Sequence, residues 1–327
     1  MGDILEGKVA VITGSGRGMG RAHALAIAAQ SAKVVVNDPG VDVHGVGIDK
    51  SPADEVVAEI RKKGGEAVAN YDSVATSKGA ANLIKTAVDN FGRLDILVNN
   101  AGIFGRFAWI WELTDEEFDK MIKTHLYGHF YCAREAVKVF RNQNYGRIIN
   151  VSSSAGLAQG YGDDKYPRNV HYSSAKESIV GLTRTLASEV ASEAGIPGVT
   201  VNCIRPGAGT RLMQTLVLER LTKEVGLKEA KRQVEMMIQN HPPEAVASLV
   251  VFLASDAASN VNGCIFYVDA GEVSIYHDPP YKVGTVWKKG LWTPEELVEL
   301  LPKTLTAEKV RKPMIKEDFS YANYASE

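Results

Sequence analysis

Short apolar runs rich in β-branched residues recur along the chain and alternate with longer stretches of helical periodicity. The runs occupy residues 9–13, 33–37, 67–70, 96–99, 147–152, 200–204 and 265–268. Unbroken runs of this kind suit strands that are covered on both faces, and the helical stretches between them suit parallel crossovers. The pattern therefore predicts an α/β fold built on a doubly wound parallel sheet, with right-handed crossovers.

Helical spacing of apolar residues predicts helices over 53–63, 78–91, 116–142 and 173–192. Three segments interrupt the alternation: a Gly-rich connection (39–52), a polar stretch (159–169) and an insertion (211–240). Because irregular connections of this length commonly carry function, we expect substrate specificity or assembly to reside there. The apolar residues of the insertion further predict a helical cover over a substrate pocket.

The domain prediction is a single domain over residues 1–273, followed by a C-terminal extension over 274–327. The extension contains aromatic residues and one expected helix, 293–301. This helix begins with Thr-Pro-Glu-Glu, a sequence typical of a helix N-terminus. Its apolar content is too thin for an independent core, so we expect it to pack on the main domain.

Composition excludes several classes of protein. The chain has 327 residues, 45% of them hydrophobic and 23% charged, with 37 Lys and Arg against 39 Asp and Glu. This composition is typical of a globular protein with a sizeable core, and a net charge of −2 provides no general attraction for nucleic acid. The scattered Cys132, Cys203 and Cys264 predict reduced thiols, without a disulfide framework or a zinc site.

The N-terminal segment has acidic residues where a signal peptide is basic, and glycines break its apolar run. No apolar stretch approaches the roughly eighteen residues that a membrane-spanning helix needs. We therefore expect a cytoplasmic protein without a membrane span.

The segment 13–20, Thr-Gly-Ser-Gly-Arg-Gly-Met-Gly, follows the first apolar run and opens an Ala-rich helical stretch. Glycines at this junction let backbone amides and a helix N-terminus approach a pyrophosphate. The position after a strand and before a helix favours dinucleotide binding over a merely tight turn. The residues expected at the cofactor are Gly14, Ser15, Arg17, Gly18, Met19 and Gly20.

Asp38 ends the second run, eighteen residues after Gly20, where a carboxylate accepts from both hydroxyls of an adenosine ribose. A 2′-phosphate there would bring about two negative charges, and a repulsion of about 1.4 kcal/mol already means tenfold weaker binding. Arg17 argues the other way, since a guanidinium can bind that phosphate. The balance favours NAD. Asp72 is either a ligand of the adenine amine or a solvated loop carboxylate.

Tyr172 and Lys176 are four residues apart and therefore lie on one face of a helix, about one turn from each other. Opposite unit charges about 4 Å apart attract by about 4 kcal/mol at an effective dielectric constant near 20, which favours ionisation of a phenol. Tyr172 is thus a candidate general base for alcohol oxidation and the acid for the reverse reaction.

Taken together, five motifs resemble those of the short-chain dehydrogenase/reductase family, in the family's order and over roughly residues 5–272. They are the glycine segment 13–20, Asn-Asn-Ala-Gly at 99–102, Asn-Val-Ser-Ser at 150–153, Tyr-Ser-Ser-Ala-Lys at 172–176 and Arg-Pro-Gly at 205–207. The resemblance implies a Rossmann fold and a nicotinamide cofactor. It also implies a dimer or tetramer of identical chains, assembled through the helices expected at 116–142 and 173–192.

The resemblance also implies roles for individual residues. Tyr172 would be the acid/base, Lys176 its electrostatic partner and a ligand of the nicotinamide ribose, and Ser153 a hydrogen-bond donor to the substrate oxygen. Residues 99–102 would line the cofactor cleft, and Pro206 and Gly207 would flank the nicotinamide. The residues expected to bind the cofactor there are Ser73, Asn99, Ala101, Gly102, Pro206 and Gly207. Ser153 stands nineteen residues before Tyr172, against a family spacing of about thirteen, and the excess falls within the polar stretch 159–169.

His125 departs from the family pattern, because most members carry an Asn there that supports a proton-relaying water. An imidazole nitrogen can serve the same relay, and a hydrogen-bonded core histidine is an equally good interpretation. His125 and His129 also have the spacing of a metal pair. Leu126 stands where a zinc protease needs Glu and no third ligand is evident, so we expect no metal.

Blocks at 37–40, 45–47, 64–74, 124–126 and 208–211 resemble the (3R)-hydroxyacyl-CoA dehydrogenase domains of type 2 peroxisomal multifunctional enzymes. This resemblance implies NAD-dependent oxidation of a 3-hydroxyacyl-CoA, a small-molecule CoA thioester. The aromatic residues at 104, 107, 109 and 111 would suit a cyclic, aromatic or steroidal acyl group, or equally core packing or a subunit contact. The alternatives are a dehydrogenase of a free secondary alcohol and a non-catalytic binding module.

Overall fold

The computed structural model describes residues 2–157, 168–192, 195–209, 218, 221–222, 225–277, 285–289 and 291–305. Most of the polar stretch 159–169 lies outside these residues, as does most of the first half of the insertion 211–240. Internal contacts divide the chain into two units, Met1–Asp278 and Pro279–Glu327. The division falls five residues after the expected domain boundary, and packing of the extension on the main domain stays a prediction.

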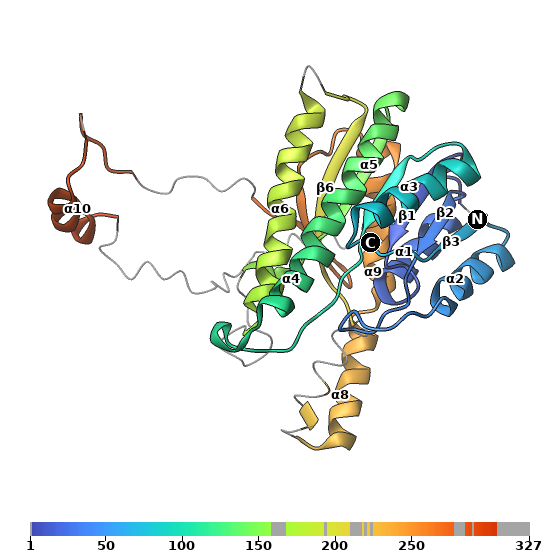
Figure 1. Cartoon of the computed structure of the whole chain (residues 1–327), viewed down its shortest axis with the longest axis horizontal. Coiled ribbons are helices and arrows are strands. Elements are labelled where there is room, and N and C mark those ends of the chain that lie inside the picture. Colours follow the sequence, from blue (N-terminus) through green and yellow to red (C-terminus); the bar gives the residue numbers. More distant parts are fainter. Residues whose placement is uncertain are drawn as a thin grey trace, which may run out of the picture. The chain divides into compact units, whose positions relative to one another are not determined.

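The first unit is built on one eight-stranded sheet in the order β3-β2-β1-β4-β5-β6-β7-β8 (Figure 1). Its strands are β1 Val9–Thr13, β2 Lys33–Asn37, β3 Ala67–Asn70, β4 Ile96–Asn99, β5 Gly146–Val151, β6 Val199–Gly207, β7 Ile265–Asp269 and β8 Glu272–Ile275. All pairs from β3 to β7 are parallel. The predicted doubly wound α/β fold is confirmed, with strands at all seven expected runs.

Strand β8 was not predicted and pairs antiparallel with β7. A two-residue connection joins them, with Ala270 in the left-handed region at φ 46°. The strand has only four residues, three of them exposed, so it lacks the buried apolar run that marks the other strands. The sheet is therefore parallel from β3 to β7, with one antiparallel strand added at this edge.

Helices cover both faces of the sheet (Figure 1). They are α1 Gly18–Ala29, α2 Ser51–Lys62, α3 Ser77–Phe91, α4 Asp115–Ile122, α5 Gly128–Gln143, α6 Val170–Ala191, α8 Leu227–Asn240 and α9 Pro243–Ala254, with α10 Pro294–Leu300 in the second unit. One buried cluster joins the sheet to α1, α2 and α9, and another joins it to α3, α5 and the end of α6. The sheet is thus buried on both sides, as its apolar strands require.

The helix expected over 116–142 is interrupted. A turn of π-helix, Lys123–Tyr127, separates α4 from α5 and contains the buried His125. A π turn inserts one extra residue into an otherwise α-helical ladder and commonly lies at functional sites. Spacing of apolar residues does not resolve such a local widening, which explains why the sequence predicts one continuous helix.

Two asparagine pairs join neighbouring strands near their carboxyl ends. Asn37 donates to the side-chain oxygen of Asn70 at 2.8 Å, and Asn99 donates to that of Asn150 at 3.0 Å. Each pair is in register across its strands. Because Val and Ile neighbours tolerate several registers, these buried amide pairs specify one alignment of the strand ends that carry the site.

No helix among the described residues is long and apolar enough to cross a membrane.

Candidate active site

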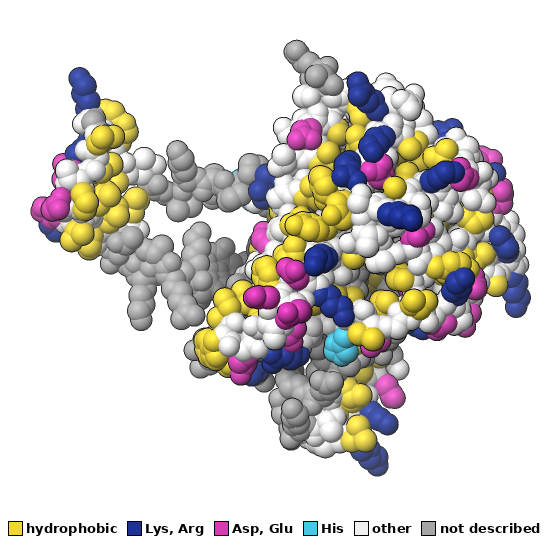
Figure 2. All heavy atoms as spheres, in the orientation of Figure 1, with side chains coloured by type: hydrophobic (Ala, Val, Ile, Leu, Met, Phe, Trp, Pro, Cys, Tyr) yellow, Lys and Arg dark blue, Asp and Glu magenta, His cyan; other side chains and the backbone are white. Residues whose placement is uncertain are grey.

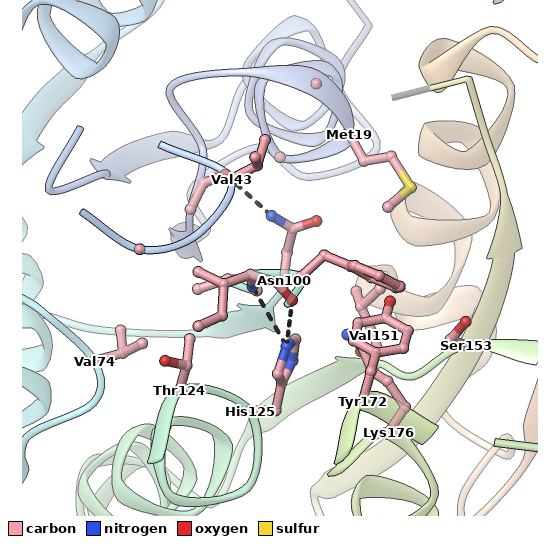
Figure 3. Close-up of a pocket in the computed structure, with 18 of the residues that line it drawn as sticks. Met19, Val43, Val74, Asn100, Thr124, His125, Val151, Ser153, Tyr172 and Lys176 are labelled. Carbon is pink, nitrogen blue, oxygen red and sulfur yellow. Dashed lines mark hydrogen bonds between the residues drawn. The ribbon is translucent and has the colours of Figure 1, made fainter. Parts of the chain in front are cut away.

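A cavity of about 750 Å³ opens at the carboxyl ends of the parallel strands. Its wall includes Gly14 after β1, Asp38 after β2, Ala101 after β4, Ser153 after β5 and Pro206 near the end of β6. Loops at this edge of a doubly wound sheet are where such folds bind dinucleotides. Figure 3 shows side chains from these segments, from the π turn and from α6 converging on the cavity.

Most of the predicted site residues line this cavity. They are Gly14, Arg17, Gly18, Met19, Gly20, Asp38, Ser73, Ala101, Gly102, His125, Ser153, Tyr172, Lys176, Pro206 and Gly207. Ser15, Asp72 and Asn99 are not among the lining residues. The hydroxyl of Ser15 donates to Ile12 O, the carboxylate of Asp72 accepts from Asn70, and Asn99 pairs with Asn150. These three groups hold the framework of the cleft.

The glycine loop passes close to the backbone that follows β4. Gly14 has φ +60°, and a Cβ there would lie 2.8 Å from the Cα of Ala101. No side chain caps the N-terminus of α1 at Arg17, so its first amides can donate to a bound anion. The loop and helix therefore fit a pyrophosphate.

Asn100 lines the cavity and also anchors this loop, a role that the sequence does not predict. Its backbone N–H donates to Thr13 Oγ1 at 2.9 Å, and its side-chain amide donates to the carbonyls of Thr13 at 2.8 Å and Gly14 at 3.1 Å. Asn100 lies within the expected Asn-Asn-Ala-Gly motif, but nothing in the spacing distinguishes it as the residue that binds the glycine loop.

Asp38 is held in place by backbone amides. Its Oδ2 accepts from Gly16 N at 2.9 Å and its Oδ1 from Gly40 N at 2.7 Å. Both oxygens keep lone pairs for further donors such as ribose hydroxyls. Arg17 lies 3.4 Å from the carboxylate of Asp49, so its guanidinium has a local partner.

The Gly-rich connection 39–52 covers part of the cavity. Phe104 N donates to Val43 O at 2.9 Å, and His44 Nδ1 lies 3.3 Å from Phe104 O. Val41, Asp42, Val43 and Gly45 line the cavity. The sequence marks this connection as unusual, and the structure adds its attachment to the loop after β4.

Tyr172 and Lys176 lie on α6 with their side chains on one wall (Figure 3). The Nζ of Lys176 lies 5.7 Å from the centre of the Tyr172 ring and donates to Val151 O at 2.8 Å. Burial lowers the pKa of Lys176 to about 8, because desolvation disfavours its ammonium form. A buried cation beside a phenol is the electrostatic arrangement that favours a phenolate.

The three consecutive serines after β5 have different surroundings. Ser152 is buried and donates to Lys176 O at 2.6 Å. Ser153 lines the cavity, and its hydroxyl oxygen accepts from Ala155 N at 3.1 Å, which leaves the hydroxyl hydrogen available for a ligand. Ser154 also lines the cavity, but its oxygen is buried without a hydrogen-bond partner among the described residues. The geometry is consistent with Ser153 as the substrate-binding hydroxyl.

His125 is fully buried, with its ring 5.4 Å from that of Tyr172 in an edge arrangement. Its Nε2 lies 2.9 Å from Ile103 O and 3.3 Å from Ile103 N, so it donates to the carbonyl in one tautomer and accepts from the N–H in the other. Burial, followed by the charge of Lys176, lowers the pKa of His125 well below the usual value, so the ring is neutral. Nδ1 has no partner among the described residues. A neutral imidazole beside Tyr172 suits a relayed proton, and that role stays a prediction.

His125 and His129 are both buried. Nowhere in the described part of the chain do three or more His, Cys, Asp or Glu residues come close enough to hold a metal ion. Burial lowers the pKa of His129 to about 3, which matches a neutral core histidine.

Aromatic residues continue from Tyr172 toward the surface. The ring of Phe104 lies 4.7 Å from that of Tyr172 and 5.3 Å from that of Phe107. Trp109 and Trp111 stack at 5.1 Å, and Trp111 is 74% exposed. Phe104 lines the cavity, whereas the other three aromatic residues do not.

Known proteins share this sequence and fold. A family model described as enoyl-(acyl carrier protein) reductase matches residues 14–272. The peroxisomal multifunctional enzyme type 2 of Mus musculus is 41% identical over 266 residues, or 81% of this chain and 32% of that protein. A 3-oxoacyl-[acyl-carrier-protein] reductase of Synechocystis sp. is 39% identical over 270 residues, or 82% of this chain and 98% of that protein. The crystal structure of a short chain dehydrogenase from Mycobacterium avium has 38% identity and a TM-score of 0.72, covering 93% of this chain and 96% of that one.

The chain spans about a third of the length of the mouse relative and nearly all of the Synechocystis protein. The residues that the family model matches, 14–272, include the glycine loop from Gly14 onward, strands β2 to β7 and the Tyr-Lys helix α6.

Proposed function

Because the chain belongs to the short-chain dehydrogenase/reductase family, we propose that it is an NAD-dependent dehydrogenase that oxidises a 3-hydroxyacyl-CoA to the 3-oxoacyl-CoA. The observation that carries the proposal is the shared cavity. Ser153, Tyr172 and Lys176 line the same cavity as the glycine loop and Asp38.

The residues of the cavity divide the chemical work. Ser153 donates a hydrogen bond to the substrate oxygen and orients the alcohol. Tyr172, as phenolate, removes the hydroxyl proton, while the ammonium of Lys176 stabilises the negative charge of the phenolate. NAD, bound along the glycine loop, supplies the acceptor for the hydride that leaves carbon 3. The reverse reaction uses the same groups with Tyr172 as the acid.

The proposal of NAD over NADP rests on Asp38. The amides of Gly16 and Gly40 hold the Asp38 carboxylate at the edge of the cavity. Because the carboxylate is held there, it cannot turn away to make room for the 2′-phosphate of NADP. Arg17 is already paired with Asp49, which weakens its attraction for that phosphate.

The proposal of a 3-hydroxyacyl thioester rests on the relatives. The Synechocystis protein is named for a 3-oxoacyl substrate and the family model for an acyl thioester. Sequence blocks of this chain also resemble (3R)-hydroxyacyl-CoA dehydrogenase domains. Phe104 beside Tyr172 provides an apolar wall suited to a cyclic, aromatic or steroidal acyl group.

We also propose a homo-oligomer, dimer or tetramer, in the cytoplasm. Figure 2 shows apolar side chains gathered over α4, α5 and α6. Phe118, Tyr127 and Phe130 are each more than 40% exposed on this face. An apolar patch of this kind on a helical face suits contact with a second copy.

The test is a panel of 3-hydroxyacyl-CoA thioesters and matched free secondary alcohols, assayed with NAD and with NADP. We expect turnover of a thioester with NAD. If only free alcohols are oxidised, the substrate is a free secondary alcohol and not a CoA thioester. If neither class is oxidised, the proposal is overturned.

Tyr172→Phe tests the catalytic assignment. We expect kcat to fall by about 10²-fold or more, the scale of lost general acid–base catalysis, with NAD binding retained. Tyr145→Phe is the matched control, because its hydroxyl bonds Asp256 outside the cavity, and its kcat should stay within twofold of the native value. An unchanged rate for Tyr172→Phe would refute the assignment.

A further inference from the structure

We propose that Arg205 is a positioning residue, which acts with Glu177 from outside the cavity to hold the backbone of Ser153 where its hydroxyl meets the substrate. This inference rests on the proposed function of Ser153. Neither Arg205 nor Glu177 lines the cavity.

The guanidinium of Arg205 joins three separate segments. From β6, its Nη1 donates to Ser153 O at 2.7 Å. Its Nη2 reaches both carboxylate oxygens of Glu177 on α6, at 2.9 and 3.2 Å. Ser153 O also accepts from Gly156 N at 3.2 Å, which closes the turn after β5. Arg205 thereby connects the serine to the residue that follows Lys176.

The turn after β5 packs closely against this pair. A Cβ on Gly156 would overlap the carboxylate of Glu177 and lie 3.1 Å from Arg205 Nη1. The Tyr276 ring centre lies 5.4 Å from the guanidinium carbon of Arg205. The turn that presents Ser153 is thus bounded by the Arg205–Glu177 pair beneath it.

Two other hydrogen bonds hold the end of β5 and the following residue, Ser152, against Lys176 on α6. Lys176 Nζ donates to Val151 O, and Ser152 Oγ donates to Lys176 O. Both hydrogen bonds hold residues that immediately precede Ser153. The hydrogen bond from Arg205 holds the next residue, Ser153 itself, and fixes the position of the serine relative to α6, the helix that carries Tyr172.

Stability alone does not account for Arg205. Only 4% of its side chain is exposed, against 44% for Glu177, and its Nε is buried without a hydrogen-bond partner among the described residues. A buried cation with an orphaned N–H group is an unfavourable way to hold a fold together. Its contacts instead converge on the serine and on the catalytic helix.

Arg147 provides a matched comparison within the same sheet. It is also 4% exposed, lies on the neighbouring strand β5, and bonds a carbonyl, Gly198 O at 2.9 Å, and a carboxylate, Asp256 at 3.5 Å. It lies at the opposite end, beside the first residue of its strand. The two arginines have similar burial and partners but differ in distance from the cavity.

The effect on the reaction follows from geometry. A displacement of about 1 Å in a group that orients the substrate can reduce the rate by about 10²-fold. Without Arg205, the Ser153 carbonyl keeps only the Gly156 contact, and the turn gains freedom. The loss should therefore appear in kcat, while the cofactor contacts of the glycine loop are unaffected.

The experiment compares Arg205→Met with Arg147→Met in the full chain, using the thioester or alcohol that the native protein oxidises fastest. We expect kcat to fall ten- to a hundredfold in Arg205→Met, with the Kd for NAD changed less than twofold. Arg205→Lys, which can reach one partner but not both, should recover part of kcat. Arg147→Met should lower the thermal midpoint and leave kcat within twofold.

Repeating Arg205→Met in a Ser153→Ala background separates positioning from a general structural role. If Arg205 acts through the serine, its removal should change the residual kcat less than twofold there. An equal loss in both backgrounds, or an equal loss in Arg147→Met, would overturn the inference. Should Arg205→Met not fold, Glu177→Gln replaces it, with an expected three- to tenfold loss of kcat that is again absent in the Ser153→Ala background.

Failure of this inference is distinct from failure of the proposed function. If the proposed function is wrong, the native protein will show no activity, or Tyr172→Phe will have an unchanged rate. If only the inference is wrong, the Tyr172→Phe variant will be inactive but the effects of replacing Arg205 and Ser153 will be additive.

Discussion

Lys176, the proposed partner of Tyr172, illustrates how a single buried charge lowers stability. Its pKa falls from 10.5 to about 8 on burial, a difference that corresponds to about 3 kcal/mol. Because the folded pKa is the lower one, the unfolded chain binds more protons between pH 8 and 10.5, and this group makes stability rise with pH across that window. Below pH 8 its full unfavourable contribution is present.

We therefore expect Lys176→Met to be more stable than the native protein at pH 7. The gain should be about 2 kcal/mol, since the lost hydrogen bond to Val151 O offsets about 1 kcal/mol. The difference should shrink from pH 8 to 10.5 as the native protein loses its buried charge. Urea unfolding at pH 7, 8.5 and 10 measures it, and a difference independent of pH would contradict the burial argument.

Asp38→Asn should reduce the preference for NAD over NADP in kcat/KM by at least about tenfold, because it removes the negative charge that repels a 2′-phosphate. An amide oxygen can accept from only one of Gly16 N and Gly40 N, so the KM for NAD should also rise. Initial rates with both cofactors measure these effects. An unchanged ratio would show that another group sets the preference.

The spacing of residues along the sequence can predict a site residue only when its partner or its strand lies close in sequence. Tyr172 and Lys176 share a helical turn, and Asp38 follows a strand at a characteristic distance. Arg205 and Glu177 are 28 residues apart, and their contact depends on how β6 and α6 pack, which no local pattern encodes.

At the scale of elements, the glycine loop and α1 form a unit that tolerates little added volume. A Cβ on Gly20 would overlap Gly14 O and lie 2.6 Å from Asn100 Nδ2 and 2.8 Å from Ser15 Cα. Since two of these neighbours are backbone atoms of the same loop, the steric overlap can be removed only if the loop moves.

Gly20→Ala should therefore weaken NAD binding by about tenfold or more and lower stability. Gly181→Ala on α6 is the control, because a Cβ there meets nothing within 4 Å. It should stabilise the protein by about 1 kcal/mol through helix propensity, with NAD affinity unchanged. Calorimetric titration with NAD and thermal unfolding test both variants. Equal NAD affinity in Gly20→Ala and the native protein would contradict the close-packed loop.

Most helices and strands follow from the chain's hydrophobic pattern, because buried parallel strands leave long apolar runs. The elements that escape prediction have weaker signals. Strand β8 is short and exposed, α9 is apolar around most of its circumference and so lacks a clear stripe, and the π turn differs from an α-helix only in local geometry.

At the scale of the whole molecule, buried histidines set the response to acid. Burial lowers the pKa of His23 and of His129 to about 3. With an unfolded value of 6.5, the unfolded chain binds more protons between pH 6.5 and 3. Stability is therefore fully present above pH 6.5 and falls as the pH decreases, by about 1.4 kcal/mol per pH unit for each histidine.

His23→Leu should reduce the slope of the unfolding free energy against pH, between pH 6.5 and 3, by about 1.4 kcal/mol per pH unit. A second replacement, His129→Leu, should reduce this slope again by a similar amount. Urea unfolding at pH 7, 5.5 and 4.5 measures the slopes. A curve for His23→Leu that runs parallel to the native one would show that other groups control acid unfolding.

Strand β8 runs antiparallel to its one neighbour, β7, so the chain leaves the sheet near Ile275, opposite Phe266. The next residue, Tyr276, lies against the guanidinium of Arg205, which bonds the carbonyl of Ser153. Any polypeptide beyond this strand therefore starts beside the turn that carries the serine, and a change in its course would be felt there first.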